Sequence, residues 1–156
     1  MIYLVLVKMI HGHLPRPDLL LRHGLVEEFQ QLAQALRTGD LRLFDQVLTA
    51  NQAFYMHKEI FLVIQLQLRN LILRSFLKKL YLIGLNLGAH PENRLNLHLV
   101  VAALTTLAIP DMSLDEVECI TASLIHHGFI KGYISHEKSM VVLSKKSAFP
   151  PPSTVL

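Results

Sequence analysis

The chain has 156 residues, of which 51% are hydrophobic and 17% are charged, and its net charge is +3 with the histidines neutral. This apolar composition excludes a disordered chain, and the length suffices for one domain or two small ones. The mild basic excess permits an acidic partner without requiring nucleic acid, and the single cysteine excludes an internal disulfide framework and fits a reducing compartment.

Two apolar segments raise the question of a membrane span or an export signal. The opening MIYLVLVKMI contains Lys8 and is followed by no small-residue cleavage site, so we interpret it as a core helix. We expect its upstream neighbours to be missing, which would make the chain a shortened form of a longer protein. The longest apolar stretch, 60–84, contains several arginines and lysines, whereas a spanning helix of about 20 residues carries few or no charges. No membrane association is expected.

Helical periodicity dominates the first half of the chain. After a break at 14–17 (LPRP), apolar residues at helical spacing predict a helix over 25–38, which Gly39 ends. Asp40 begins a second predicted helix, LRLFDQVLTA, and the two-residue connection requires the two helices to be antiparallel. The stretch 60–84 is apolar around most of its circumference, which predicts the longest helix, buried on several sides.

The pattern changes after a loop that contains Gly88 and Pro91. The residues 95–97 predict a short strand, and 98–107 predict a short helix that Pro110 breaks. This loop is the best internal boundary of the chain.

A second short helix and a hairpin follow. Ser113 begins the helix, Glu116 completes a capping box three residues later, and Gly128 follows its end. Two β-rich runs at 130–135 and 140–144 predict a hairpin. Short strand, helix, turn, helix and hairpin is the order of a winged helix.

The predicted fold class is therefore mainly α, with a stack of helices followed by a winged helix that ends in a small β-hairpin. The predicted ranges are 1–92 for the helical stack, 93–147 for the winged helix and 148–156 for an extended Pro-rich tail. The prolines of that tail lack donor N–H groups, which favours an extended backbone.

The predicted helix 114–127 holds the only cysteine and paired histidines, which suggests a metal or catalytic site. One turn after Cys119, however, stand Ala122 and Ser123, and His126 lies about 10 Å along the helix axis, too far to share a zinc ion. The sequence contains no Gly-rich phosphate loop, nucleophile elbow or HExxH motif. We predict no catalytic residue, metal or cofactor, and a protein that is not an enzyme.

The front of the same helix carries carboxylates where a DNA-reading helix would meet the duplex. Asp115 and Glu116, with Glu118 beside them, repel phosphates, so this helix is a poor reader of base edges. A protein contact is favoured instead. The predicted partner-binding residues are Asp115, Glu116, Cys119, Ser123 and His126.

Basic residues cluster elsewhere, and two interpretations of them remain open. They form either a solvated helix face and a soluble hairpin, or a surface that contacts phosphates, since backbone binding needs clustered charge rather than a motif. On the second interpretation the nucleic-acid-binding residues are Arg74, Lys78, Lys79, Lys131, Lys138, Lys145 and Lys146.

The chain resembles the PCI domain, a helical stack leading into a winged helix that occurs in scaffold subunits of the proteasome lid, the signalosome and a translation initiation factor. The segments FLKKLYLI (76–83) and SLDEVECITASLIHHGFIKGYISHEKSMVVLSKKSAFPPPSTV (113–155) are similar to the branch of this family found in the transcription-and-export complex at nuclear pores. Glu118, Gly128 and Ile130 follow the general family pattern. Ser135 stands where many members carry an acid, and GYISH is typical of the export branch.

The resemblance implies a non-catalytic scaffold subunit of messenger RNA export. It implies pairing with the PCI domain of a large partner, binding of a small acidic disordered protein, and a platform of two winged helices that binds RNA or DNA. Its expected location is the nucleus and also the cytoplasm. The alternative is a purely protein-binding PCI module in a signalosome-like or lid-like assembly, which salt-dependent RNA binding would distinguish.

Overall fold

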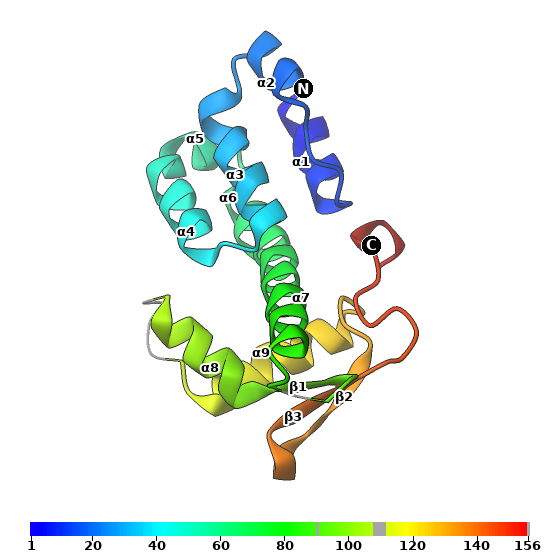
Figure 1. The fold of residues 1–156 in the computed structure, drawn as a ribbon. Coiled ribbons are helices and arrows are strands. Elements are labelled where there is room, and N and C mark those ends of the chain that lie inside the picture. The colour runs from blue at the N-terminus through cyan, green and yellow to red at the C-terminus, as the bar shows by residue number, and fades with distance from the viewer. Residues whose placement is uncertain (90, 108–111, 156) are drawn as a thin grey trace. The chain divides into compact units, whose positions relative to one another are not determined.

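The computed structural model describes residues 1–89, 91–107 and 112–155 (Figure 1). The chain divides into two compact units, Met1–Phe76 and Leu77–Val155. This boundary falls inside the long helix α7 (Arg69–Asn86), whereas the sequence placed a boundary in the loop after it. The predicted domain ranges stay a prediction.

The first unit is helical. Its elements are α1 (Ile2–Ile10), α2 (Pro17–Arg22), α3 (Val26–Thr38), α4 (Leu41–Ala50), α5 (Gln52–His57), α6 (Phe61–Val63), the π-helical segment η1 (Ile64–Leu68) and the beginning of α7. The predicted helices at the opening segment, 25–38 and 41–50 are confirmed. The helix α2 was not predicted, because Pro17 was taken only as a break. Proline is well tolerated in the first turn of a helix, where its missing N–H would have no intrahelical partner.

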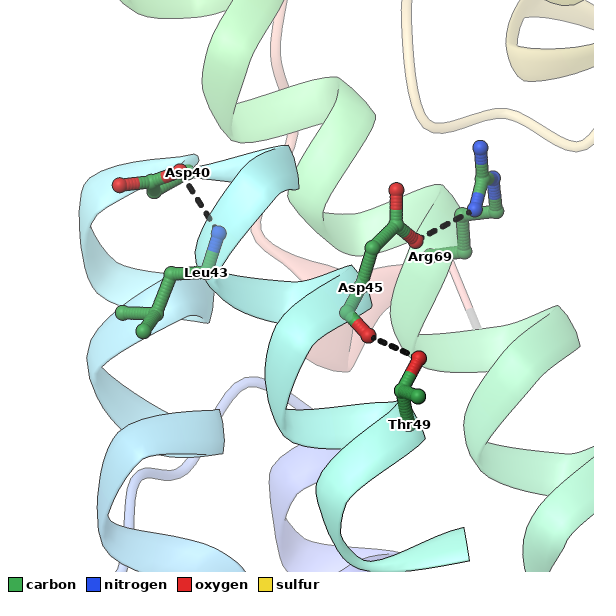
Figure 2. A network of polar contacts seen from close by, with 5 residues as sticks. All are labelled: Asp40, Leu43, Asp45, Thr49 and Arg69. Carbon is green, nitrogen blue, oxygen red and sulfur yellow. Dashed lines mark hydrogen bonds and ion pairs between the residues drawn. The ribbon is translucent and has the colours of Figure 1, made fainter.

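The hairpin of α3 and α4 follows its predicted signals. Gly39 ends α3 in the left-handed conformation, with φ of 68°, and donates its backbone N–H to the Ala35 carbonyl at 2.8 Å. Asp40 begins α4, and its carboxylate accepts from the Leu43 backbone N–H at 3.0 Å, as Figure 2 shows. Phe29 of α3 and Phe44 of α4 are both fully buried. The local signals therefore place the apolar faces of both helices in the core.

The predicted long helix at 60–84 is a succession of three helical elements. α6 leads into the π-helical segment η1, and α7 follows directly. Ile64 and Leu68 of η1 are fully buried, whereas Leu66 between them is 62% exposed. The wider π turn was not predicted, because apolar periodicity does not distinguish it from an α-helical turn.

The second unit holds a three-stranded antiparallel sheet and two helices of a winged helix, together with the end of α7. Its other elements are β1 (Arg94–Asn96), α8 (Leu97–Thr106), α9 (Leu114–His126), β2 (Gly132–Ser135), the 3₁₀ turn η2 (His136–Lys138), β3 (Met140–Leu143) and the 3₁₀ turn η3 (Pro152–Thr154). The strand order is β1-β3-β2, so the predicted strand pairs with the predicted hairpin. The mainly helical fold with a small sheet is confirmed. Pro110, predicted to end the first of these helices, lies outside the described residues.

The two faces of this sheet differ in burial. Leu95, Val141 and Leu143 are at most 3% exposed and form its inner face. The alternate positions point the other way, and the row Arg94, Val142 and Tyr133 runs across all three strands on that outer face. The helix α9 buries Val117 and Leu124 in the same way, so its opposite side is left to solvent.

The Pro-rich tail packs against other residues of the second unit. The Phe149 ring lies 6.1 Å from the Tyr81 ring between centroids, and Pro150 is buried. The Lys131 backbone N–H donates to the Ala148 carbonyl at 2.8 Å, and Pro151 keeps an extended backbone before η3. An extended backbone was predicted over 148–156, and the 3₁₀ turn η3 departs from it because Pro152, Ser153 and Thr154 turn back on themselves. The packing of the tail was not predicted.

Within the described ranges, no helix has both the length and the apolar character needed to cross a lipid bilayer.

Candidate partner and nucleic-acid surfaces

The predicted partner-binding residues share one side of α9. We call this side the α9 face, and it consists of the exposed residues Asp115, Glu116, Cys119, Ser123 and His126. The opposite side of the helix holds the buried residues Val117, Thr121 and Leu124. The buried Thr121 hydroxyl donates to the Val117 carbonyl at 2.7 Å, so the apolar side of α9 carries no unsatisfied hydroxyl there. The structure therefore brings these five residues together on an accessible surface.

Glu116 has a structural role on this face. Its carboxylate accepts from the Ser113 backbone N–H at 2.7 Å, while the Ser113 hydroxyl accepts from the Glu116 backbone N–H at 3.2 Å. The Ser113 backbone N–H and, at 3.0 Å, the Ser113 hydroxyl both donate to this carboxylate, which favours its charged form and lowers the pKa of the Glu116 carboxyl. The predicted capping box is confirmed, and this carboxylate is held at the start of α9.

Glu118 lies beside the α9 face and reaches the hairpin. Its carboxylate is 2.7 Å from Nδ1 of His136 in η2, and its side chain is 15% exposed. The hydrogen bond and the charge of Glu118 raise the pKa of the His136 imidazole. Sequence reasoning treated the two residues separately, because their pairing depends on how the hairpin folds back onto α9.

The paired histidines at the end of α9 do not form a metal site. His127 Nδ1 lies 2.7 Å from the carbonyl oxygen of Ser123, and the rings of His126 and His127 meet edge to face at 5.4 Å between centroids. In the part of the chain that the structure describes, no group of three or more histidine, cysteine, aspartate or glutamate side chains is placed to hold a metal ion.

Three of the predicted basic residues gather at one end of the hairpin. Lys131 precedes β2, Lys145 and Lys146 follow β3, and all three are exposed. The Ser144 backbone N–H donates to the Lys131 carbonyl at 2.8 Å, and the Lys146 backbone N–H donates to the Ser144 hydroxyl at 3.3 Å. We call these residues the hairpin lysines. The backbone that carries these three lysines is thus fixed by hydrogen bonds.

The other predicted lysines lie on separate elements. Lys138 is exposed in η2, at the opposite end of the hairpin. Lys78 and Lys79 are exposed on α7. Only part of the predicted basic set therefore forms a cluster.

Arg74 departs from the predicted surface exposure and is the one correction to the basic set. The residue is only 8% exposed, and Leu71, one turn earlier on α7, is buried as well. Burial lowers the pKa of the guanidinium. An arginine buried in this way cannot reach a phosphate without rearrangement, so Arg74 leaves the candidate surface.

Arg69, five residues earlier, is paired within the first unit. Its guanidinium lies 3.1 Å from the Asp45 carboxylate of α4, and the Thr49 hydroxyl donates to the Asp45 carbonyl at 2.8 Å (Figure 2). Both charged side chains are more than a third exposed, so the pair contributes at most about 1 kcal/mol. It connects α4 to the start of α7.

Two residues of the outer sheet face were missed by the sequence reasoning. Tyr133 of β2 is 63% exposed, and Arg94 of β1 is also exposed. The alternation along 130–135 is the signal that could have set Tyr133 opposite the apolar positions. Only the pairing with β3 brings Arg94 to the same face.

Comparison with known families and proteins gives a consistent result. The family described as "PCI domain" matches residues 48–145. PCI domain-containing protein 2 of Xenopus laevis is 39% identical over 155 residues, which cover 99% of this chain and 37% of that protein. The PCI domain-containing protein 2 homolog of Drosophila melanogaster is 37% identical over 150 residues, which cover 96% of this chain and 36% of that protein. Protein CSN12 homolog of Mycosarcoma maydis is 38% identical over 165 residues, which cover 98% of this chain and 35% of that protein. The chain spans little more than a third of the length of these relatives.

Proposed function

The chain belongs to the PCI-domain family, and we propose that it is a scaffold subunit of a transcription-coupled messenger RNA export complex. PCI-domain proteins are generally non-catalytic scaffold modules that assemble with other PCI proteins in multi-subunit complexes. In this proposal the chain pairs with a large PCI protein, binds a small acidic disordered protein and contributes a basic surface for RNA or DNA. It acts in the nucleus and also in the cytoplasm.

The observation that carries this proposal is the family match over 48–145. That range runs from within α4 to just past β3, so it includes α8, α9 and the three strands of the sheet. The resemblance of 113–155 to the export branch supports the finer assignment.

The proposed surfaces for protein and nucleic acid lie on different elements. The α9 face carries the carboxylates of Asp115 and Glu116 and suits a protein partner. The hairpin lysines suit phosphates, and they also suit the small acidic protein, since both ligands are anionic. RNA would compete with the acidic protein if both used these lysines.

Affinity purification of the tagged chain from nuclear and cytoplasmic extracts tests the scaffold role. We expect a second PCI protein in near-stoichiometric amount, identified by mass spectrometry. The double variant Asp115→Lys and Ser123→Lys should lose this partner, because it places two lysines on the α9 face. The control Gln30→Lys, at an exposed position of α3, should retain it. Recovery of the chain without any other PCI protein would contradict the proposal.

The second candidate is a purely protein-binding PCI module of a signalosome-like or proteasome-lid-like assembly. The burial of Arg74 favours it, since this removes one cation from the predicted basic surface. Salt-dependent binding of single-stranded RNA by the partner complex separates the two candidates, because the second one predicts no such binding.

A further inference from the structure

The outer face of the three-stranded sheet is defined by strand register. Arg94 of β1 pairs with Val142 of β3, which pairs with Tyr133 of β2. Residues paired directly across antiparallel strands point to the same face, so these three side chains form one row. The next row, Leu95, Val141 and Ile134, points the opposite way, and its first two members are at most 1% exposed.

This face combines an exposed aromatic ring with cations. Tyr133 is 63% exposed, and Arg94 at the other end of its row is exposed as well. The Ser144–Lys131 hydrogen bond continues the pairing of β3 and β2 by one residue, so alternation places the exposed Lys131 on the same face as Tyr133. Tyr133 therefore shares its face with Arg94 and Lys131, and the core does not require a tyrosine that is exposed in this way.

The remaining strand positions on this face add no negative charge. Alternation and register place eight described residues on the outer sheet face, and none of them is aspartate or glutamate. They are Arg94, Asn96, Lys131, Tyr133, Ser135, Met140, Val142 and Ser144. The face is therefore complementary to an anionic ligand that also offers flat apolar surfaces.

We propose that the outer sheet face binds single-stranded nucleic acid, with one base stacked on Tyr133 and with Arg94 and Lys131 contacting phosphates. Bases of a single strand can stack on exposed aromatic rings, whereas those of a duplex are stacked on one another. Arg94 and Tyr133 are two strand spacings apart, about 10 Å, so the arginine can reach a phosphate near the stacked base. This inference rests on the proposed function, and it names the nucleic acid as single-stranded.

The stacking claim is tested by titrating the purified chain into a fluorescently labelled oligouridylate RNA of about 15 nucleotides. Stacking on one aromatic ring is worth about 5- to 150-fold in affinity, so Tyr133→Ala should weaken binding about 10-fold. Tyr133→Phe keeps the ring and should stay within about twofold of the unmodified chain. The control is Tyr3→Ala, because Tyr3 of α1 is 61% exposed and lies in the other unit.

Salt dependence separates stacking from charge. Tyr133→Ala should leave the slope of log affinity against log salt unchanged, because no phosphate contact is lost. Arg94→Gln should reduce that slope by about 0.7, the value for one phosphate contact on a single strand. Irradiation of the chain with an RNA containing 4-thiouridine should attach the RNA to Tyr133 or its neighbours in β2, as located by mass spectrometry.

The outcomes distinguish this inference from the proposed function. If Tyr133→Ala binds normally while substitution of the hairpin lysines weakens binding, the sheet proposal is wrong and the nucleic-acid role stands. Crosslinks confined to residues outside 94–96 and 131–144 would overturn it as well. If the chain binds no RNA at low salt, the sheet proposal falls, and the scaffold role is decided independently by the purification of the PCI partner.

Discussion

Gly39 occupies a position where the backbones of two helices approach closely. A Cβ atom at Gly39 would lie 2.7 Å from the backbone nitrogen of Phe76 and 2.9 Å from the backbone carbonyl carbon of Ser75. Gly24 has a similar left-handed conformation, with φ of 62° against 68°, but a Cβ there would meet no atom within 4 Å. The two glycines separate the cost of a left-handed backbone from the cost of crowding.

We predict that Gly39→Ala destabilises the chain more than Gly24→Ala. Both alanines meet the left-handed penalty of about 1 kcal/mol, and Gly39→Ala adds an overpacking cost of about 1–3 kcal/mol because rigid backbone must move. Urea unfolding midpoints of the two variants measure the difference. Equal midpoints would show that α7 does not pack this closely on the turn.

Cys119 provides a chemical probe of the α9 face. It is exposed, so a small thiol reagent should modify it readily in the isolated chain without changing the circular dichroism spectrum. In the partner complex the reaction should slow at least severalfold, because a bound protein covers the thiol. Mass spectrometry of the modified chain over time gives both rates. Equal rates in the free and bound chain would exclude the α9 face as the protein contact.

Residues whose environment is set locally were predictable from the sequence. Gly39, Asp40 and the Ser113–Glu116 capping box act within a few residues, and the structure confirms each. Tyr55 was not singled out, although it is fully buried and its hydroxyl donates to the Glu28 carbonyl at 2.6 Å. Arg74 was expected on the surface. The Tyr55 hydrogen bond joins residues 27 positions apart, and periodicity along one helix does not identify such a contact.

At the level of elements, the pair of Glu118 and His136 joins α9 to the hairpin turn. His136 has a pKa raised above the ordinary value near 6.5, chiefly by its hydrogen bond to Glu118 and then by the charge of Glu118, with smaller contributions from Asp115 and Glu137. Because the folded-state pKa is the higher one, the stabilisation is fully present below about pH 6.5 and is lost as the pH rises through the folded-state value.

We therefore predict that His136→Gln removes a stabilisation that is present only at acidic pH. The variant should be less stable than the unmodified chain at about pH 5.5 and equally stable at about pH 9, where the imidazole is neutral. Thermal unfolding at both pH values measures this, and NMR titration of the imidazole gives the pKa directly. His126→Gln, at an exposed position without this carboxylate partner, is the matched control. A stability difference that does not depend on pH would refute the ionic account.

The elements themselves were predicted best where a pattern is long. The helices at 25–38, 41–50 and 114–127 follow clear periodicity and caps, and the structure reproduces them within one residue. The short helices α2 and α5 have six residues each and too few apolar repeats to be recognised. The pairing of β1 with β3 requires register between distant segments, so the outer sheet face could not be foreseen.

At the scale of the whole molecule, the second unit presents two separate surfaces. The buried side of α9 and the buried residues of the sheet belong to the core of this unit. The α9 face and the outer sheet face are the sides that these elements turn toward solvent. The proposed protein contact and the proposed nucleic-acid contact therefore use different faces of this unit.

Substitution of the three hairpin lysines tests the nucleic-acid role in the partner complex. Lys131, Lys145 and Lys146 changed to glutamate should weaken RNA binding strongly, because the positive charges at one end of the hairpin become negative. The salt slope should fall by about 2, since each phosphate contact on a single strand contributes about 0.7. The side chains are exposed, so the change in stability should stay within about 0.5 kcal/mol per site.

A control variant with the same change in net charge shows whether RNA binding depends on where the lysines lie or only on the total charge. Lys8, Arg16 and Arg42 are exposed in the first unit, and their substitution by glutamate alters the total charge equally. If local contacts carry the binding, this control keeps most of the affinity and of the salt slope, because it leaves all three hairpin lysines in place. Equal losses in both variants would indicate attraction by overall charge. Unchanged binding in the hairpin variant would remove the nucleic-acid role from these lysines and favour the purely protein-binding module.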